Sequence, residues 1–174
     1  MHEPAPHRAA ALALLRSLSG DDGIRASATA HANYAAVFAR DAVMAGIAGL
    51  LVRDEQVTSG LCATLERLRD LQGPQGQIAS NYLVHASGDP TVSFGTLVPR
   101  VDAALWYLVG VGLAARAGAI DPSAHRDAVT RVATLLDAIE YNGRHLMYGV
   151  VGGNWADEYV YEGYVLHDQV LRAW

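Results

Sequence analysis

The sequence predicts an all-α fold, a toroid of paired helices with functional loops at one rim. Apolar residues recur at helical spacing along most of the 174 residues. The sequence has few signals for strands, which would be segments of alternating polarity bounded by hairpin turns. Amphipathic helices also alternate with nearly uniformly apolar ones, so we expect hairpins with an outer and an inner member.

Three helices are expected in the first half of the chain. The first ends at Ser19-Gly20 and has an apolar face formed by Leu12, Leu15 and Leu18. The second runs from about Asn33 to Val52, where apolar residues recur at helical spacing. Thr58-Ser59 is expected to cap the third, which ends at Gly73-Pro74 and has a stripe formed by Leu61, Leu65, Leu68 and Leu71.

Three more helices are expected after an irregular stretch that runs from Gly76 to Pro99. A loop of that length inside a compact domain is usually functional. A helix from near Val101 to about Gly118 is apolar on nearly every side, which predicts a buried inner helix. The next helix has an N-cap and a proline at its first position, Asp121-Pro122, and ends at Asn142-Gly143. A last helix begins near Tyr161 and continues to Trp174.

Composition argues against several classes of protein. The net charge is −5 and the chain has no lysine, which argues against non-specific nucleic-acid binding. The single cysteine, Cys62, excludes an internal disulfide framework and fits a reducing compartment, so we expect a cytoplasmic protein. The longest apolar runs, Ala42–Val52 and Ala103–Ala115, are too short to span a bilayer, and Met1–Arg16 has the character of a soluble helix. No spacing resembles a zinc site, so neither a metal nor a cofactor is expected.

An acidic segment beside a tryptophan, from Gly152 to Tyr159, is the first candidate for chemistry. Asp157 and Glu158 follow Trp155 closely. An apolar wall raises the pKa of a carboxyl group, and a carboxylic acid kept protonated can donate its proton to a leaving group. Aromatic residues beside carboxylates are also typical of sugar sites, and here they continue as Tyr159, Tyr161 and Tyr164. The alternative interpretation is an acidic surface turn.

Two further polar positions lie on the apolar helices. The adjacent Arg40 and Asp41 point in different directions on a helix, so they form either a clamp for sugar hydroxyls or a structural ion pair with partners elsewhere. Asp102 begins the buried helix, where it can hold a ligand or cap the helix. Trp106 lies one turn further on the same face, beside any ligand that Asp102 holds. His167 is interpreted as a surface or core histidine rather than a base.

In this order, the motifs resemble the N-terminal half of the six-hairpin glycoside hydrolases. Tyr34–Leu50 (YAAVFARDAVMAGIAGL) resembles the family helix with its aromatic-x-Arg-Asp core, and Val101–Tyr107 (VDAALWY) is similar to the Val-Asp-Ala…Leu-Trp helix start. Trp155-Ala156-Asp157 resembles the Trp-x-Asp segment of debranching enzymes and the Trp-Glu-Glu of glucoamylases. Gly76–Asn81 is similar to a Gly-x-Ile-x-x-Asn loop at the barrel rim. The family includes amylo-α-1,6-glucosidases, glucoamylases and alkaline/neutral invertases.

The resemblance implies an (α/α)6 toroid, with residues 1–174 forming the N-terminal part and about half of the barrel. It implies a hydrolase acting on a glucoside or oligosaccharide, with Asp157 as general acid and Glu158 as the competing assignment. The sugar would be held by Arg40, Asp41, Asp102 and Trp155. The family takes its catalytic base from the C-terminal half, so we expect either a fragment of a longer enzyme or a natural half-barrel. The open side of a half-barrel is expected to promote self-association.

Two other classes of function remain open at this point. One is a non-catalytic carbohydrate-binding or helical scaffold domain. The other is a different α/α-toroid enzyme, either a polysaccharide lyase, which needs Tyr/His or Arg at its centre, or a terpenoid cyclase, which needs an acidic motif in an apolar cavity. The glycosidase interpretation requires that Asp41, Asp102 and Asp157 converge on one rim.

Overall fold

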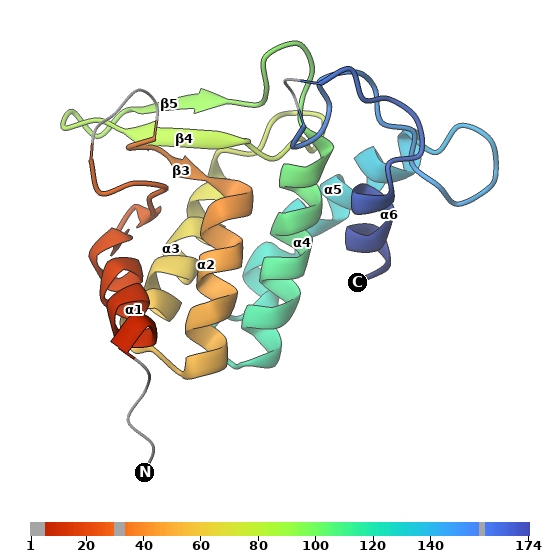
Figure 1. Ribbon diagram of the computed structural model, residues 1–174. Coiled ribbons are helices and arrows are strands. Elements are labelled where there is room, and N and C mark those ends of the chain that lie inside the picture. Colours follow the sequence, from red (N-terminus) through yellow and green to blue (C-terminus); the bar gives the residue numbers. More distant parts are fainter. Residues whose placement is uncertain (1–5, 30–33, 157–158) are drawn as a thin grey trace.

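The computed structural model describes residues 6–29, 34–156 and 159–174 of the chain (Figure 1). Over these residues it contains six α-helices, one 3-10 turn and two small antiparallel sheets. The protein is therefore predominantly helical, and the prediction of a purely α-helical fold is corrected by the sheets. The helices are α1 (Pro6–Leu18), α2 (Ala39–Val52), α3 (Glu55–Asp70), α4 (Val101–Arg116), α5 (Arg126–Ala138) and α6 (Leu166–Ala173).

The helices are arranged in two layers. Helix α2 packs against α4, and α4 packs against α6, so these three form one layer. Helix α3 lies behind α2 and contacts α4, α1 lies beside α3, and α5 packs against α4 from behind (Figure 1). The mainly apolar α4 contacts α2, α3, α5 and α6, which explains why nearly all of its faces are buried.

The two sheets lie on the N-terminal side of α2. Strands β1 (Ser19–Gly20) and β2 (Gly23–Ile24) form a short hairpin after α1. Strands β3 (Val37–Phe38), β4 (Asn81–Val84) and β5 (Pro90–Ser93) form an antiparallel sheet in the order β3-β4-β5 (Figure 1). The sequence pattern missed the β4–β5 hairpin because Tyr82 is the only fully buried residue of these two strands, so the alternation is short.

Several predicted helix boundaries are wrong. Asp121-Pro122 begins the 3-10 turn Pro122–His125, whereas α5 itself starts at Arg126 and ends at Ala138, before Asn142-Gly143. Helix α2 begins at Ala39, because Val37 and Phe38 pair with β4; Asn33, its predicted start, lies outside the described residues. Helix α3 is capped by Asp54, whose side chain accepts a hydrogen bond from the Val57 backbone at 3.0 Å, and Thr58-Ser59 lies inside the helix.

The last helix begins at Leu166 rather than near Tyr161. The preceding segment is held away from a helical conformation by an isolated antiparallel bridge between Gly149 and Gly163. In this bridge each backbone N–H donates to the other residue's carbonyl oxygen at 2.8 Å. Gly163 has φ +103°, a conformation that favours glycine.

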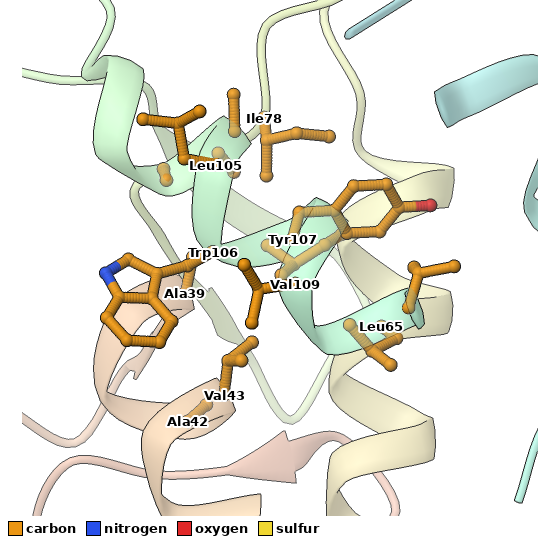
Figure 2. Packing of buried hydrophobic residues seen from close by; sticks show 14 of the residues in the cluster. Ala39, Ala42, Val43, Leu65, Ile78, Leu105, Trp106, Tyr107 and Val109 are labelled. Carbon is orange, nitrogen blue, oxygen red and sulfur yellow. The ribbon is translucent and has the colours of Figure 1, made fainter. Parts of the chain in front are cut away.

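The hydrophobic core lies between the two layers (Figure 2). Helix α2 contributes Val43, α3 contributes Leu65, and α4 contributes Leu105 and Tyr107, all fully buried. Gly110 lets α4 approach its neighbours closely, because a Cβ there would lie 2.9 Å from Leu65 and 3.1 Å from Val43. The predicted leucine stripe of α3 is buried at Leu61, Leu65 and Leu68.

A buried polar pair joins α4 to the turn before α5. The Tyr107 hydroxyl and Nδ1 of His125 are 2.8 Å apart, and both side chains are almost fully buried. Burial, together with Arg69, lowers the pKa of His125 below its ordinary value, since a charged imidazole loses its hydration there. The folded protein therefore favours neutral His125.

We expect the folded protein to lose stability as the pH falls below about 6.5, because the unfolded chain then binds a proton at His125 that the folded chain resists. The loss is at most about 1.4 kcal/mol per pH unit, and it ends where the pH reaches the lowered pKa of the folded state. Urea unfolding between pH 7 and 5 measures it. The variant His125→Asn keeps an acceptor near Nδ1 but does not titrate, so its stability should fall less steeply. Equal slopes for the two proteins would contradict the assignment.

Candidate functional site

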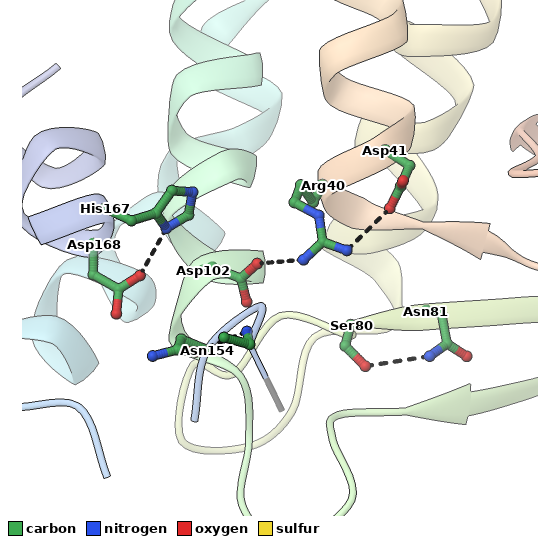
Figure 3. Close-up of polar contacts among 9 residues, drawn as sticks. Arg40, Asp41, Ser80, Asn81, Asp102, Asn154, His167 and Asp168 are labelled. Carbon is green, nitrogen blue, oxygen red and sulfur yellow. Dashed lines mark hydrogen bonds and ion pairs between the residues drawn. The ribbon is translucent and has the colours of Figure 1, made fainter. Parts of the chain in front are cut away.

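The N-termini of α2 and α4 meet at one end of the helical layers, and an ion pair joins them there (Figure 3). Nη1 of Arg40, in the first turn of α2, lies 3.2 Å from Oδ2 of Asp102, in the first turn of α4. Nη2 of Arg40 also lies 3.5 Å from Oδ2 of Asp41. The fold thus brings together two of the sequence motifs, and Arg40 is a structural ion-pair partner for both acids.

Asp102 is the most constrained acidic residue of this cluster. It is only 2% exposed, and one of its oxygens, Oδ1, has no hydrogen-bond partner among the described residues. The N-cap position of α4 is occupied by Arg100 without a side-chain capping bond, so Asp102 does not cap this helix. Burial raises the pKa of Asp102, while Arg40, His167 and Arg100 oppose the rise.

Trp106 lies one turn further along α4, on the same face as Asp102. Its indole Nε1 is buried and, like Oδ1 of Asp102, has no hydrogen-bond partner within the described part of the chain. The ring contacts His167 and Trp174, with centroid separations of 6.5 Å and 6.3 Å. One buried acceptor and one buried donor are therefore both unpaired on one helix face, which is uncommon because each such atom costs stability.

The glycine-rich loop before the predicted acid is attached to the start of α4. The Val101 backbone N–H donates to the Gly153 carbonyl at 2.7 Å. Asn154 is buried, and its Oδ1 accepts from the Ala156 backbone at 2.9 Å, which shapes the turn. Trp155 is 48% exposed, and its ring contacts the edge of His167 at a centroid distance of 6.1 Å.

Both predicted candidates for the proton donor, Asp157 and Glu158, lie outside the described residues. The described segment before them ends at Ala156, which is buried next to Asn154. Among the three carboxylates expected on one rim, the structure places Asp41 and Asp102 together, on either side of Arg40.

The sequence analysis did not assign the His167–Asp168 pair to the site, and it did not assign Ser80. His167 Nδ1 lies 3.0 Å from Oδ1 of Asp168, which is only 2% exposed (Figure 3). Burial raises the pKa of Asp168 and Asp102 adds to the rise, whereas His167 opposes it. The available sequence signal was an adjacent His-Asp pair on an amphipathic helix, which is also common on protein surfaces.

Ser80 is the other missed residue. It lies in the Gly76–Asn81 loop, and its carbonyl accepts from the Ala39 backbone at 3.0 Å, which fixes the loop to the start of α2. Gly76 positions this loop against α5, since a Cβ at that residue would lie 2.4 Å from the Arg131 carbonyl oxygen. The length of the irregular stretch was the signal for a functional loop.

Two hollows adjoin these residues. A cavity of about 10 Å³, enough for about one water molecule, is lined by Phe38, Arg40, Asp41, Ser80, Arg100, Asp102 and Ala103. A wider pocket of about 360 Å³ is lined mainly by aromatic residues and by the last loop: Asn154, Trp155, Ala156, Tyr161, Glu162, Tyr164, Val165, Leu166 and His167. Within the described ranges, no group of three or more His, Cys, Asp and Glu side chains is placed to hold a metal ion.

Comparison with known proteins adds no family assignment: no family model and no curated protein sequence matches this chain. The interpretation of the site therefore depends on its own geometry. That geometry combines an ion pair, two buried polar atoms that are unpaired among the described residues, and exposed aromatic rings.

We expect Arg40→Met to destabilise the protein by about 2–3 kcal/mol, because it leaves the buried Asp102 carboxylate without its cation. The substitution should raise the pKa of Asp102 further. The folded state then binds a proton that the unfolded state does not bind at the same pH, so the destabilisation should diminish as the pH falls from 8 towards 5. Urea unfolding at both pH values tests this expectation.

Asp41→Asn is the matched control for that experiment. Asp41 is half-exposed and its separation from Arg40 is longer, so its loss should cost less than about 0.5 kcal/mol. The double variant Arg40→Met/Asp102→Asn should be more stable than Arg40→Met alone, because it removes the buried charge. A double variant less stable than Arg40→Met would contradict the role given to this ion pair.

Proposed function

We propose that this protein is a glycoside hydrolase of the debranching-enzyme or glucoamylase type, which binds a glucoside or oligosaccharide at the α2–α4 rim. One observation carries the proposal. Asp102 Oδ1 and Trp106 Nε1 are buried, unpaired among the described residues, and located on one face of α4. A carboxylate oxygen accepts a hydrogen bond and an indole N–H donates one.

A sugar hydroxyl suits this pair because it can donate and accept at the same time. Donation to Asp102 and acceptance from Trp106 would satisfy both atoms and remove the cost of burying them unpaired. One further hydroxyl of the same ring would reach Arg40 and Asp41 at the adjoining cavity, whose volume of about 10 Å³ suits a single water-sized group. Arg40 already holds the other oxygen of Asp102, so the acceptor is oriented before the ligand arrives.

Exposed aromatic rings give a second kind of support. Trp155, Tyr161 and Tyr164 are all partly exposed around the wider pocket. A pyranose presents C–H groups that stack on such rings, while its hydroxyls remain available for polar partners. An apolar ligand would not need the charged cluster beside them, which makes a terpenoid substrate a poorer fit.

In the proposed reaction, Asp157 protonates the glycosidic oxygen as the bond to the anomeric carbon breaks, with Glu158 as the competing donor. A water molecule then attacks the anomeric carbon after losing its proton to a second carboxylate, whose identity is not assigned. Asp102, Arg40, Asp41, Trp106 and Trp155 hold the sugar. Trp155 precedes Asp157 by two residues in the sequence, and an apolar neighbour of this kind would favour the protonated carboxyl group.

The proposed architecture is a toroid of helical hairpins. The layer formed by α2, α4 and α6 would be the inner ring and the layer formed by α1, α3 and α5 the outer ring. This arrangement would place the helix ends that carry Arg40 and Asp102 at one rim. It would also leave the inner layer with apolar side chains facing the centre of the ring.

The test of function combines binding with turnover. We expect glucose, maltose, isomaltose or sucrose to bind the full chain, measured by calorimetry, and Asp102→Asn to weaken binding about tenfold or more, equivalent to about 1.4 kcal/mol. Asp157→Asn should leave binding unchanged and abolish any hydrolysis by the enzyme, because it removes the proton donor. Released glucose is the readout.

Asp127→Asn, an exposed acid on α5, provides the control for a non-specific loss of charge. If a saccharide binds but is not hydrolysed, either by this chain or by a longer protein that includes it, the carbohydrate-binding alternative is favoured. Saccharide binding that is unchanged by Asp102→Asn would disprove the site. Hydrolysis that survives Asp157→Asn but not Glu158→Gln would transfer the donor role to Glu158.

Large apolar side chains are exposed on the layer of α2, α4 and α6: Met44 and Leu51 on α2, and Val170 and Trp174 at the end of the chain. Exposed apolar patches of this kind promote self-association. We expect the isolated chain to form dimers or larger species in light scattering at high protein concentration. Met44→Lys/Leu51→Lys should shift it towards the monomer, with little change in stability. Leu14→Lys on α1 is the control and should have no effect. A wild-type monomer at all concentrations would contradict this proposal.

A further inference from the structure

The wider pocket beside α6 has the size and lining of a second ligand site. Its volume of about 360 Å³ falls within the range of about 300–1,000 Å³ typical of small-ligand sites. Three of its aromatic residues, Trp155, Tyr161 and Tyr164, are partly exposed and therefore present their rings to solvent. The Tyr164 hydroxyl also receives a hydrogen bond from the Asn142 side chain, which anchors this ring.

His167 forms part of the polar wall of this pocket, with Asn154 and Glu162, and its ring is held by the buried Asp168. Nδ1 of His167 lies 3.0 Å from Asp168, and no other hydrogen bond to the His167 ring is formed within the described residues. An ionised carboxylate only accepts hydrogen bonds, so it retains the proton on Nδ1 and leaves Nε2 as an acceptor. Figure 3 shows Nδ1 directed at Asp168 and the second ring nitrogen on the other side of the ring.

The orientation of His167 is fixed by two tryptophans. The ring contacts Trp106 and Trp155, with interplanar angles of 49° and 61°. Trp106 also belongs to the Asp102 site, so the two sites share a wall.

We propose that the pocket of Trp155, Tyr161, Tyr164 and His167 is a second sugar subsite, in which Nε2 of His167 accepts a hydrogen bond from a hydroxyl of the ligand. This inference rests on the proposed function, and it specifies the ligand further. A saccharide would place one ring at Asp102 and Trp106 and the next ring on the aromatic rings. The smallest ligand that fills both subsites is a disaccharide.

The test compares maltose, isomaltose and sucrose with glucose, by calorimetry on the full chain. At least one disaccharide should bind about tenfold or more tightly than glucose, equivalent to about 1.4 kcal/mol. His167→Asn removes the acceptor at Nε2 and should bring the affinity for that disaccharide close to the affinity for glucose. His167→Gln places an amide oxygen near the Nε2 position and should retain most of the affinity. His7→Gln, an exposed position on α1, is the control.

Nitrogen-15 NMR of the imidazole provides a readout that does not depend on activity. We expect the wild type to show a protonated Nδ1 and a bare Nε2, and Asp168→Asn to lose this preference. A bare Nδ1 in the wild type would overturn the acceptor role. Disaccharide binding that depends on Asp102 but is unchanged in His167→Asn would overturn the second subsite alone. Failure of every saccharide to bind would overturn both this inference and the proposed function.

Discussion

The ion pair between Arg40 and Asp102 is the interaction on which the rest of the rim depends. It joins the first turns of α2 and α4, whose N-termini have no side-chain capping hydrogen bonds. Two backbone hydrogen bonds, from Ala39 to Ser80 and from Val101 to Gly153, attach a loop to each of these helix starts. The charge pair therefore positions the two helix ends, and the helix ends position the two loops that border the site.

Basic and acidic side chains alternate across the layer of α2, α4 and α6. The order is Arg40 on α2, Asp102 on α4, then His167 and Asp168 on α6, so each buried carboxylate has a cationic or imidazole neighbour. This pairing offsets part of the cost of removing two carboxylates from water. It also separates the rim into two polar positions with Trp106 between them, because the tryptophan touches the His167 ring and follows Asp102 by one helical turn.

The sequence predicted the helices well and the connections poorly. Helix α4 was recognisable because Leu105, Tyr107 and their neighbours are apolar on every side, and the leucine stripe defined α3. The β4–β5 hairpin has no such signal, since Tyr82 is the only fully buried residue of its two strands and no alternation of buried and exposed residues is visible. For the site, sequence reasoning identified Arg40, Asp41 and Asp102. It set His167 aside as a surface or core histidine, because the contacts of this ring with Trp106, Trp155 and Asp168 form only in the folded chain.

The reciprocal hydrogen bonds between Gly149 and Gly163 close the intervening chain into a loop whose two ends are adjacent. Loops closed in this way tolerate changes of length, since the entropic cost grows slowly with added residues and the flanking elements keep their positions. The loop carries Trp155, Tyr161 and Glu162, whereas Asp102 and Arg40 belong to the helical frame. The aromatic rings of the wider pocket therefore lie on a loop whose length can change without moving the helices that carry the Arg40–Asp102 ion pair.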